Sequence, residues 1–160
     1  MKREALRYLE NAKEILGKSP IEDNVYLDEK YVKSACGVAY LGVLKAIDEY
    51  LLNKGLAKKD LPKKAEEYEK ALQRYAGIHN GTIQRLFDRV YRELHIAGYY
   101  RGLLSGTDTV KDAIKAAKDF IGKLLTTPCP PLLRGNKRGL FPLLRGIKKF
   151  EVVKNYLYAY

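Results

Sequence analysis

The chain contains two histidines, His79 and His95, so histidine chemistry has two candidate centres. Each follows an arginine closely: four residues separate Arg74 from His79, and five separate Arg89 from His95. An imidazole titrates near neutral pH, and a guanidinium group can hold a phosphate with two donors. Chemistry on a phosphate would therefore have a candidate centre at such a pair, and the chain offers this loose spacing twice.

Tyrosine is abundant, with 13 residues against no tryptophan. Aromatic rings can stack on nucleic-acid bases. Most of these tyrosines, however, fall on or beside the inward stripes of predicted helices, where a ring that fills a helix interface is the commoner role. Tyr99, Tyr100 and Arg101 form the one cluster that suggests a binding groove, and His79 is a further candidate binding residue.

Other site types are missing from the sequence. It has no glycine-rich phosphate loop, no paired-carboxylate metal set and no nucleophile elbow. Cys36 and Cys129 make neither a disulfide framework nor a zinc set, which needs four ligands at close spacing. We therefore expect no metal and no cofactor.

Five amphipathic segments predict the elements that position these residues. The period indicates a first helix over 2–16 that ends at Gly17, and a central helix over 28–53 with Asp28 as N-cap. The centre of that helix, ACGVAYLGVL, has no charge, so it should be covered on several sides. Further helices are predicted to begin at Asp60-Leu61-Pro62, at Thr82, and after an Asp108 or Thr109 cap.

These helices predict an all-α, up-and-down bundle of four to five helices over residues 1–126. No segment before residue 127 alternates like a strand. Residues 127–160 change character, since a Pro-Leu-Leu-Arg-Gly repeat there brackets Asn-Lys-Arg-Gly. We expect a flexible, low-complexity, Pro/Gly-rich basic tail that is poorly ordered.

The formal net charge of +11 is unevenly distributed. Residues 128–160 hold seven Lys/Arg against one acid, a net of +6, so the other 127 residues carry only +5. A basic arm for nucleic acid or an anionic membrane is an alternative role for the tail. The charged first residues, MKREALRYLE, do not resemble a signal peptide, and no uncharged run is long enough to span a bilayer. The expected location is the cytoplasm, without a membrane partner.

The bundle resembles the HEPN superfamily, on two features. One is a long second helix rich in small residues, KYVKSACGVAYLGVLKAIDEYL, and the other is a later helix preceded by Ile78-His79-Asn80-Gly81. The resemblance implies a helical bundle that is either a metal-independent endoribonuclease or a partner of nucleotidyltransferases. The chain also looks like an uncharacterised bacterial family of small bundles with a segment such as LHIAGYYRGL, which implies no activity.

The nuclease members use an Arg and a His, usually across a dimer. Carried over, His95 would take the proton of a ribose 2′-hydroxyl and Arg89 would stabilise charge on the attacked phosphate. The structural alternative is that Arg89 pairs with Glu93 on the surface and that His95 lies partly buried beside Tyr91 and Tyr99. The preferred hypothesis is a non-enzymatic protein that pairs with itself or with a nucleotidyltransferase; a dimeric endoribonuclease acting on RNA is the alternative.

Overall fold

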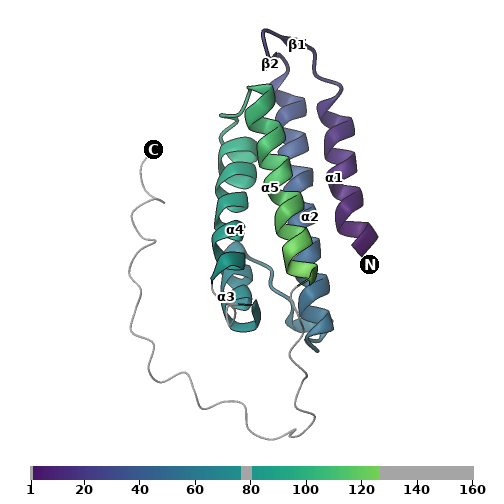
Figure 1. Ribbon diagram of the computed structural model, residues 1–160, viewed down its shortest axis with the longest axis vertical. Coiled ribbons are helices and arrows are strands. Elements are labelled where there is room, and N and C mark those ends of the chain that lie inside the picture. The colour runs from purple at the N-terminus through teal and green to yellow at the C-terminus, as the bar shows by residue number, and fades with distance from the viewer. Residues whose placement is uncertain (1, 77–80, 127–160) are drawn as a thin grey trace, which may run out of the picture. The chain divides into compact units, whose positions relative to one another are not determined.

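The computed structural model describes residues 2–76 and 81–126, and this part of the chain is mainly helical, as predicted (Figure 1). The predicted tail, His79 and Cys129 lie outside the described residues. The helices in chain order are α1 (Lys2–Leu16), α2 (Glu29–Asn53), the 3₁₀ turn η1 (Lys58–Asp60), α3 (Ala65–Ala76), α4 (Thr82–Val90), the π-helix η3 (Tyr91–Tyr100) and α5 (Thr107–Thr126).

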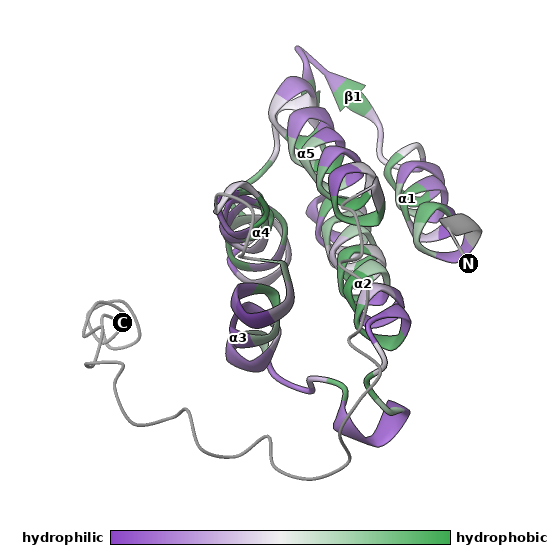
Figure 2. Ribbon diagram, turned by 60° about the horizontal axis from the view of Figure 1, so that its bottom comes forward, coloured by the Kyte–Doolittle hydropathy of each residue, from purple (hydrophilic) through white to green (hydrophobic). Residues whose placement is uncertain are grey.

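The central position of α2 is confirmed. α2 packs against α1, α5 and η3, and the apolar sides of α1, α2 and α5 face one another (Figure 2). Ala39 and Val43, in the uncharged middle of α2, are fully buried. At Gly42 a Cβ would lie 2.8 Å from the Cβ of Tyr8, so the missing side chain lets α1 approach α2 closely. Asp28 caps α2 as expected, because its carboxylate accepts a hydrogen bond from the backbone of Lys30.

A short β-hairpin connects α1 to α2, and the prediction of no strand before residue 127 is wrong here. Strands β1 (Ile21–Glu22) and β2 (Val25–Tyr26) pair antiparallel. Asp23 and Asn24 between them both have positive φ, 47° and 62°, as a tight two-residue turn requires. Strands of two residues are too short to show alternation. The hairpin also bonds to the segment before α5, through Tyr26 N to Ser105 O at 2.9 Å.

Two predicted helix starts are also wrong. Asp60 lies in η1, and α3 begins only at Ala65, where the Glu67 carboxylate accepts a hydrogen bond from the backbone N–H of Lys63. α5 begins at Thr107, before both predicted caps, because the hairpin holds this residue through a bond from Thr107 N to Asn24 O. At α3 this contact is local, four residues apart, whereas at α5 it comes from the distant hairpin.

None of the helices within 2–76 and 81–126 has the length and the apolar content needed to cross a bilayer.

Candidate functional site

Arg89 lies near the end of α4, with its side chain about half exposed. Its Nε donates to Glu93 Oε1 at 2.8 Å, which is the ion pair that the sequence predicted. The hydrogen bond to Glu93 and the charge of that carboxylate raise the pKa of Arg89. Asp112 and Asp119 of α5 add to this effect. The guanidinium group is therefore already paired with one carboxylate, that of Glu93.

His95 lies in η3 within a cluster of tyrosine rings. The imidazole is 5.3 Å from the ring of Tyr91 and 6.0 Å from that of Tyr99, the two neighbours predicted from the sequence. A third ring, Tyr40 of α2, is nearer, at 4.8 Å and stacked on the imidazole. Burial lowers the pKa of His95, so the neutral imidazole is favoured.

The structure does not bring Arg89 and His95 together within one chain. Arg89 contacts Glu93 and lies near α5, whereas His95 stacks against Tyr40 of α2. Among the described residues, neither side chain forms a hydrogen bond or ion pair with the other. A joint role would need the arginine of a second copy.

The π-helix explains why the aromatic residues stay on one side. Phe87, Tyr91, His95 and Tyr99 are spaced by four, and each ring contacts the next. Four residues exceed one α-helical turn, so this row would drift around an α-helix. In a π-helix, which bonds residue i to i+5 and has wider turns, four residues make slightly less than one turn. The change at Tyr91 therefore corrects the drift and keeps Tyr91, His95 and Tyr99 against α2.

Two glycines bring η3 and α2 close together. A Cβ at Gly98 would lie 2.6 Å from Cys36 Sγ, and a Cβ at Gly37 would lie 2.8 Å from the Tyr99 ring. Cys36 is fully buried at this contact, and burial raises the pKa of its thiol to about 11. Cys36 is therefore a packing residue, because the thiolate that would react is disfavoured.

The residues of the predicted cluster, Tyr99, Tyr100 and Arg101, differ in their surroundings. Tyr99 lies over Gly37 of α2 and is 50% exposed, whereas Tyr100 is 75% exposed. Arg101 is exposed and follows the last residue of η3. Tyr99 of η3 thus packs on the surface of α2.

Sequence reasoning missed an open face of α2. Leu41 is 52% exposed, although it lies in the uncharged centre of the central helix. Gly37, one helical turn before Leu41, lies beneath Tyr99 of η3. Gly42, the residue after Leu41, faces α1. Leu41 therefore lies on the side of α2 between η3 and α1. Val38 and Leu44, three residues to either side, are half-buried. The signal was present, because an uncharged run that is apolar all round marks either full burial or an unpaired contact surface.

The described residues contain no group of three or more His, Cys, Asp or Glu side chains placed to hold a metal ion.

Comparison with known proteins places this bundle in a family. Residues 1–126 match the domain of unknown function DUF5618. A protein of unknown function from Dyadobacter fermentans has a similar structure, with a TM-score of 0.62 and 34% sequence identity, over 77% of this chain and 91% of that one. No curated protein matches the chain. The expected likeness to an uncharacterised family is confirmed: the chain belongs to the DUF5618 family.

Proposed function

We propose that this protein is a non-enzymatic interaction module of HEPN-like type, and that it pairs with a second copy through the open face of α2. The observation that carries the proposal is the exposure of Leu41 beside the half-exposed ring of Tyr99. The long central helix rich in small residues supports the HEPN-like assignment. Exposed apolar patches on soluble domains commonly mark contact surfaces, and tyrosine is enriched at interface centres.

The charges at the ends of this face favour a second copy. From Ser34 to Leu44 the helix has no charged residue. The lysines that bound this run are already paired within the chain, Lys33 with Glu29 at 2.6 Å and Lys45 with Glu4 at 3.6 Å. An uncharged strip with neutralised ends can meet itself across a two-fold axis without like-charge repulsion.

Solution mass tests this proposal. We expect the wild-type protein to form a dimer in sedimentation equilibrium, and Leu41→Asp to be a monomer with unchanged helical circular dichroism, because a carboxylate would be buried unpaired at the interface. Leu27→Asp is the matched control, since Leu27 is 58% exposed but lies in the α1–α2 connection. A wild-type monomer, or a Leu41→Asp dimer, would refute self-pairing.

A nucleotidyltransferase is the other partner that the resemblance implies for this face. Two results together would favour this complex over self-pairing. The wild-type protein would be a monomer that binds a nucleotidyltransferase, and Leu41→Asp would abolish that binding.

One observation favours an endoribonuclease as the second candidate. Long π-helical segments are rare and often lie at functional sites. In this chain the π-helix holds a half-buried His95 whose lowered pKa suits a general base. Metal-free RNA cleavage that is lost in both His95→Phe and Arg89→Ala would support this function. Phenylalanine at position 95 keeps a ring in the stack, so a loss of activity in His95→Phe would not result from lost packing. If the wild-type protein does not cleave RNA, this function is excluded.

A further inference from the structure

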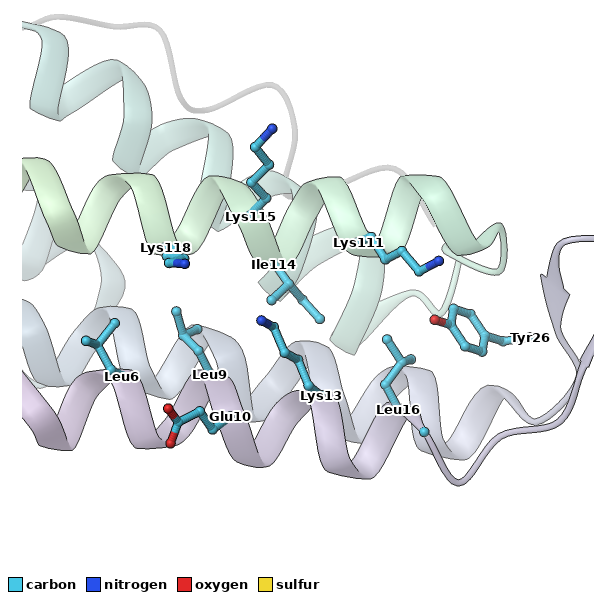
Figure 3. A pocket seen from close by; sticks show the side chains of 11 residues that line it. Leu6, Leu9, Glu10, Lys13, Leu16, Tyr26, Lys111, Ile114, Lys115 and Lys118 are labelled. Atoms are coloured by element: carbon cyan, nitrogen blue, oxygen red, sulfur yellow. The ribbon is translucent and has the colours of Figure 1, made fainter.

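A separate groove lies between α1 and α5, on residues that the open face of α2 does not use. Its cavity volume is about 770 Å³ (Figure 3). Leu6, Leu9 and Leu16 line it from α1, Ile114 lines it from α5, and Tyr26 lies at the hairpin end. Both helices pack on α2 but leave this apolar space between them.

The rim of the groove is positively charged. Lys111, Lys115 and Lys118 follow one side of α5 at i, i+4 and i+7, and Lys13 lies on α1. Glu10 is the one acidic residue among the lining residues, so four lysines against one acid give +3. All four lysines are exposed, and none takes part in the ion pairs within the described part of the chain.

The row of lysines places like charges at neighbouring positions of α5. Like charges at i, i+3 and i+4 on a helix each cost about 0.2–0.5 kcal/mol. Asp108, Asp112 and Asp119 lie three or four residues from Lys111 or Lys115, so they offset part of this cost. None of them forms an ion pair with these lysines in the described part of the chain. An occupant that brings acidic groups to the rim would pair with these lysines, which form no ion pair of their own within the described residues.

We propose that this groove binds an acidic amphipathic helix of a partner protein. From Lys111 to Lys118 the rim extends about 10 Å, two helical turns, and from Leu6 to Leu16 the apolar floor extends about 15 Å. A helix with apolar residues at i, i+3, i+4 and i+7 fills such a floor, and Asp or Glu residues beside them reach both rims. The lysines are distributed along the groove, which matches a row of carboxylates rather than the single head group of a fatty acid. The chain's own residues 128–160 carry a net charge of +6, so the rim repels them.

A designed peptide tests the groove. It has roughly 14 residues, about 20 Å as a helix, with a leucine stripe and glutamates on both flanks. One control peptide replaces the glutamates with lysines, and a second keeps the composition but scrambles the stripe. We expect the first peptide to bind, more weakly as salt increases, and both controls to bind at least roughly tenfold more weakly.

Protein variants locate the binding. Lys115→Glu/Lys118→Glu should weaken the peptide's affinity roughly tenfold or more, because two attractive contacts become repulsive. Lys58→Glu/Lys59→Glu makes the same change in net charge in the exposed turn η1 and should leave the affinity unchanged. Leu41→Asp should also leave it unchanged, so this result does not depend on self-pairing.

Three outcomes would overturn the proposal. Equal binding of all three peptides would show a non-specific effect of charge or of apolar content. Equal loss in the two double-lysine variants would show that net charge, and not the groove, attracts the peptide. Oleate binding at the α5 lysines without any binding of the acidic helix would assign the groove to a small amphiphile.

Discussion

Gly98→Ala is the sharpest test of how η3 packs on α2. A Cβ at Gly98 would lie 2.6 Å from Cys36 Sγ and 2.8 Å from Cys36 Cβ, whereas non-bonded carbon atoms pack best at about 3.5–4.0 Å. Cys36 is fully buried and has no solvent to move into. One of the two helices must therefore shift.

The magnitude follows from two opposing effects. Overpacking a core costs about 1–3 kcal/mol, and replacing glycine by alanine within a helix returns about 0.5–1 kcal/mol. The central values leave a net loss of about 1 kcal/mol in the free energy of unfolding, which lowers Tm by roughly 2–4 °C in a chain of this size.

Urea denaturation followed by circular dichroism measures this loss, and Gly122→Ala is the matched control. A Cβ at Gly122 in α5 would meet no atom within 4 Å, so there the substitution should stabilise the protein by about 0.5–1 kcal/mol. The two substitutions should therefore have opposite signs. Gly98→Ala that is as stable as Gly122→Ala would refute the close packing.

A double variant adds a second check on the same contact. Cys36→Ala removes the sulfur but keeps the Cβ, which a Cβ at position 98 would still meet at 2.8 Å. Gly98→Ala should therefore cost less in the Cys36→Ala background, without becoming free of cost. Strict additivity of the two substitutions would contradict the contact.

Two further predictions concern the ring cluster and the hairpin. Burial lowers the pKa of His95 in the folded protein, so the unfolded chain takes up the proton at higher pH. This contribution to the free energy of unfolding should be complete above about pH 6.5 and lost as the pH falls toward the folded pKa. Urea titrations should show a smaller loss for His95→Phe than for the wild-type protein, and an unchanged loss would contradict the assignment. Asn24 has φ 62°, so Asn24→Gly should be tolerated, whereas Asn24→Val should lower the free energy of unfolding by about 1–2 kcal/mol. Thermal denaturation measures the difference, and equal stability of the two variants would argue against the turn.

The regular helices could be predicted because their causes lie within a few residues. The apolar period of 2–16 with Gly17 after it, and Asp28 before the central helix, match α1 and the cap of α2. The ion pair of Arg89 with Glu93 was predictable for the same reason, since i, i+4 side chains meet on any α-helix.

Apart from the start of α3, where Glu67 accepts from Lys63 only four residues away, the misses have causes that are distant in the sequence. The bond from Tyr26 to Ser105 joins segments that no local window sees together. The π-helical turn at Tyr91–Tyr100 reflects packing of Gly98 on Cys36 and of Tyr99 on Gly37, two contacts with another helix. The third ring beside His95, Tyr40, comes from α2 and follows from that same packing.

The sequence by itself determined which segments are helical and which of their sides are apolar, because hydrophobic period and capping act over one or two turns. Only the tertiary structure decided which apolar side remained uncovered. The uncharged residues of α2 look equivalent along the chain, yet Val43 is fully buried and Leu41 is half exposed. The difference arises because α1, α5 and η3 cover three sides of the helix, and the direction left open depends on how distant segments pack.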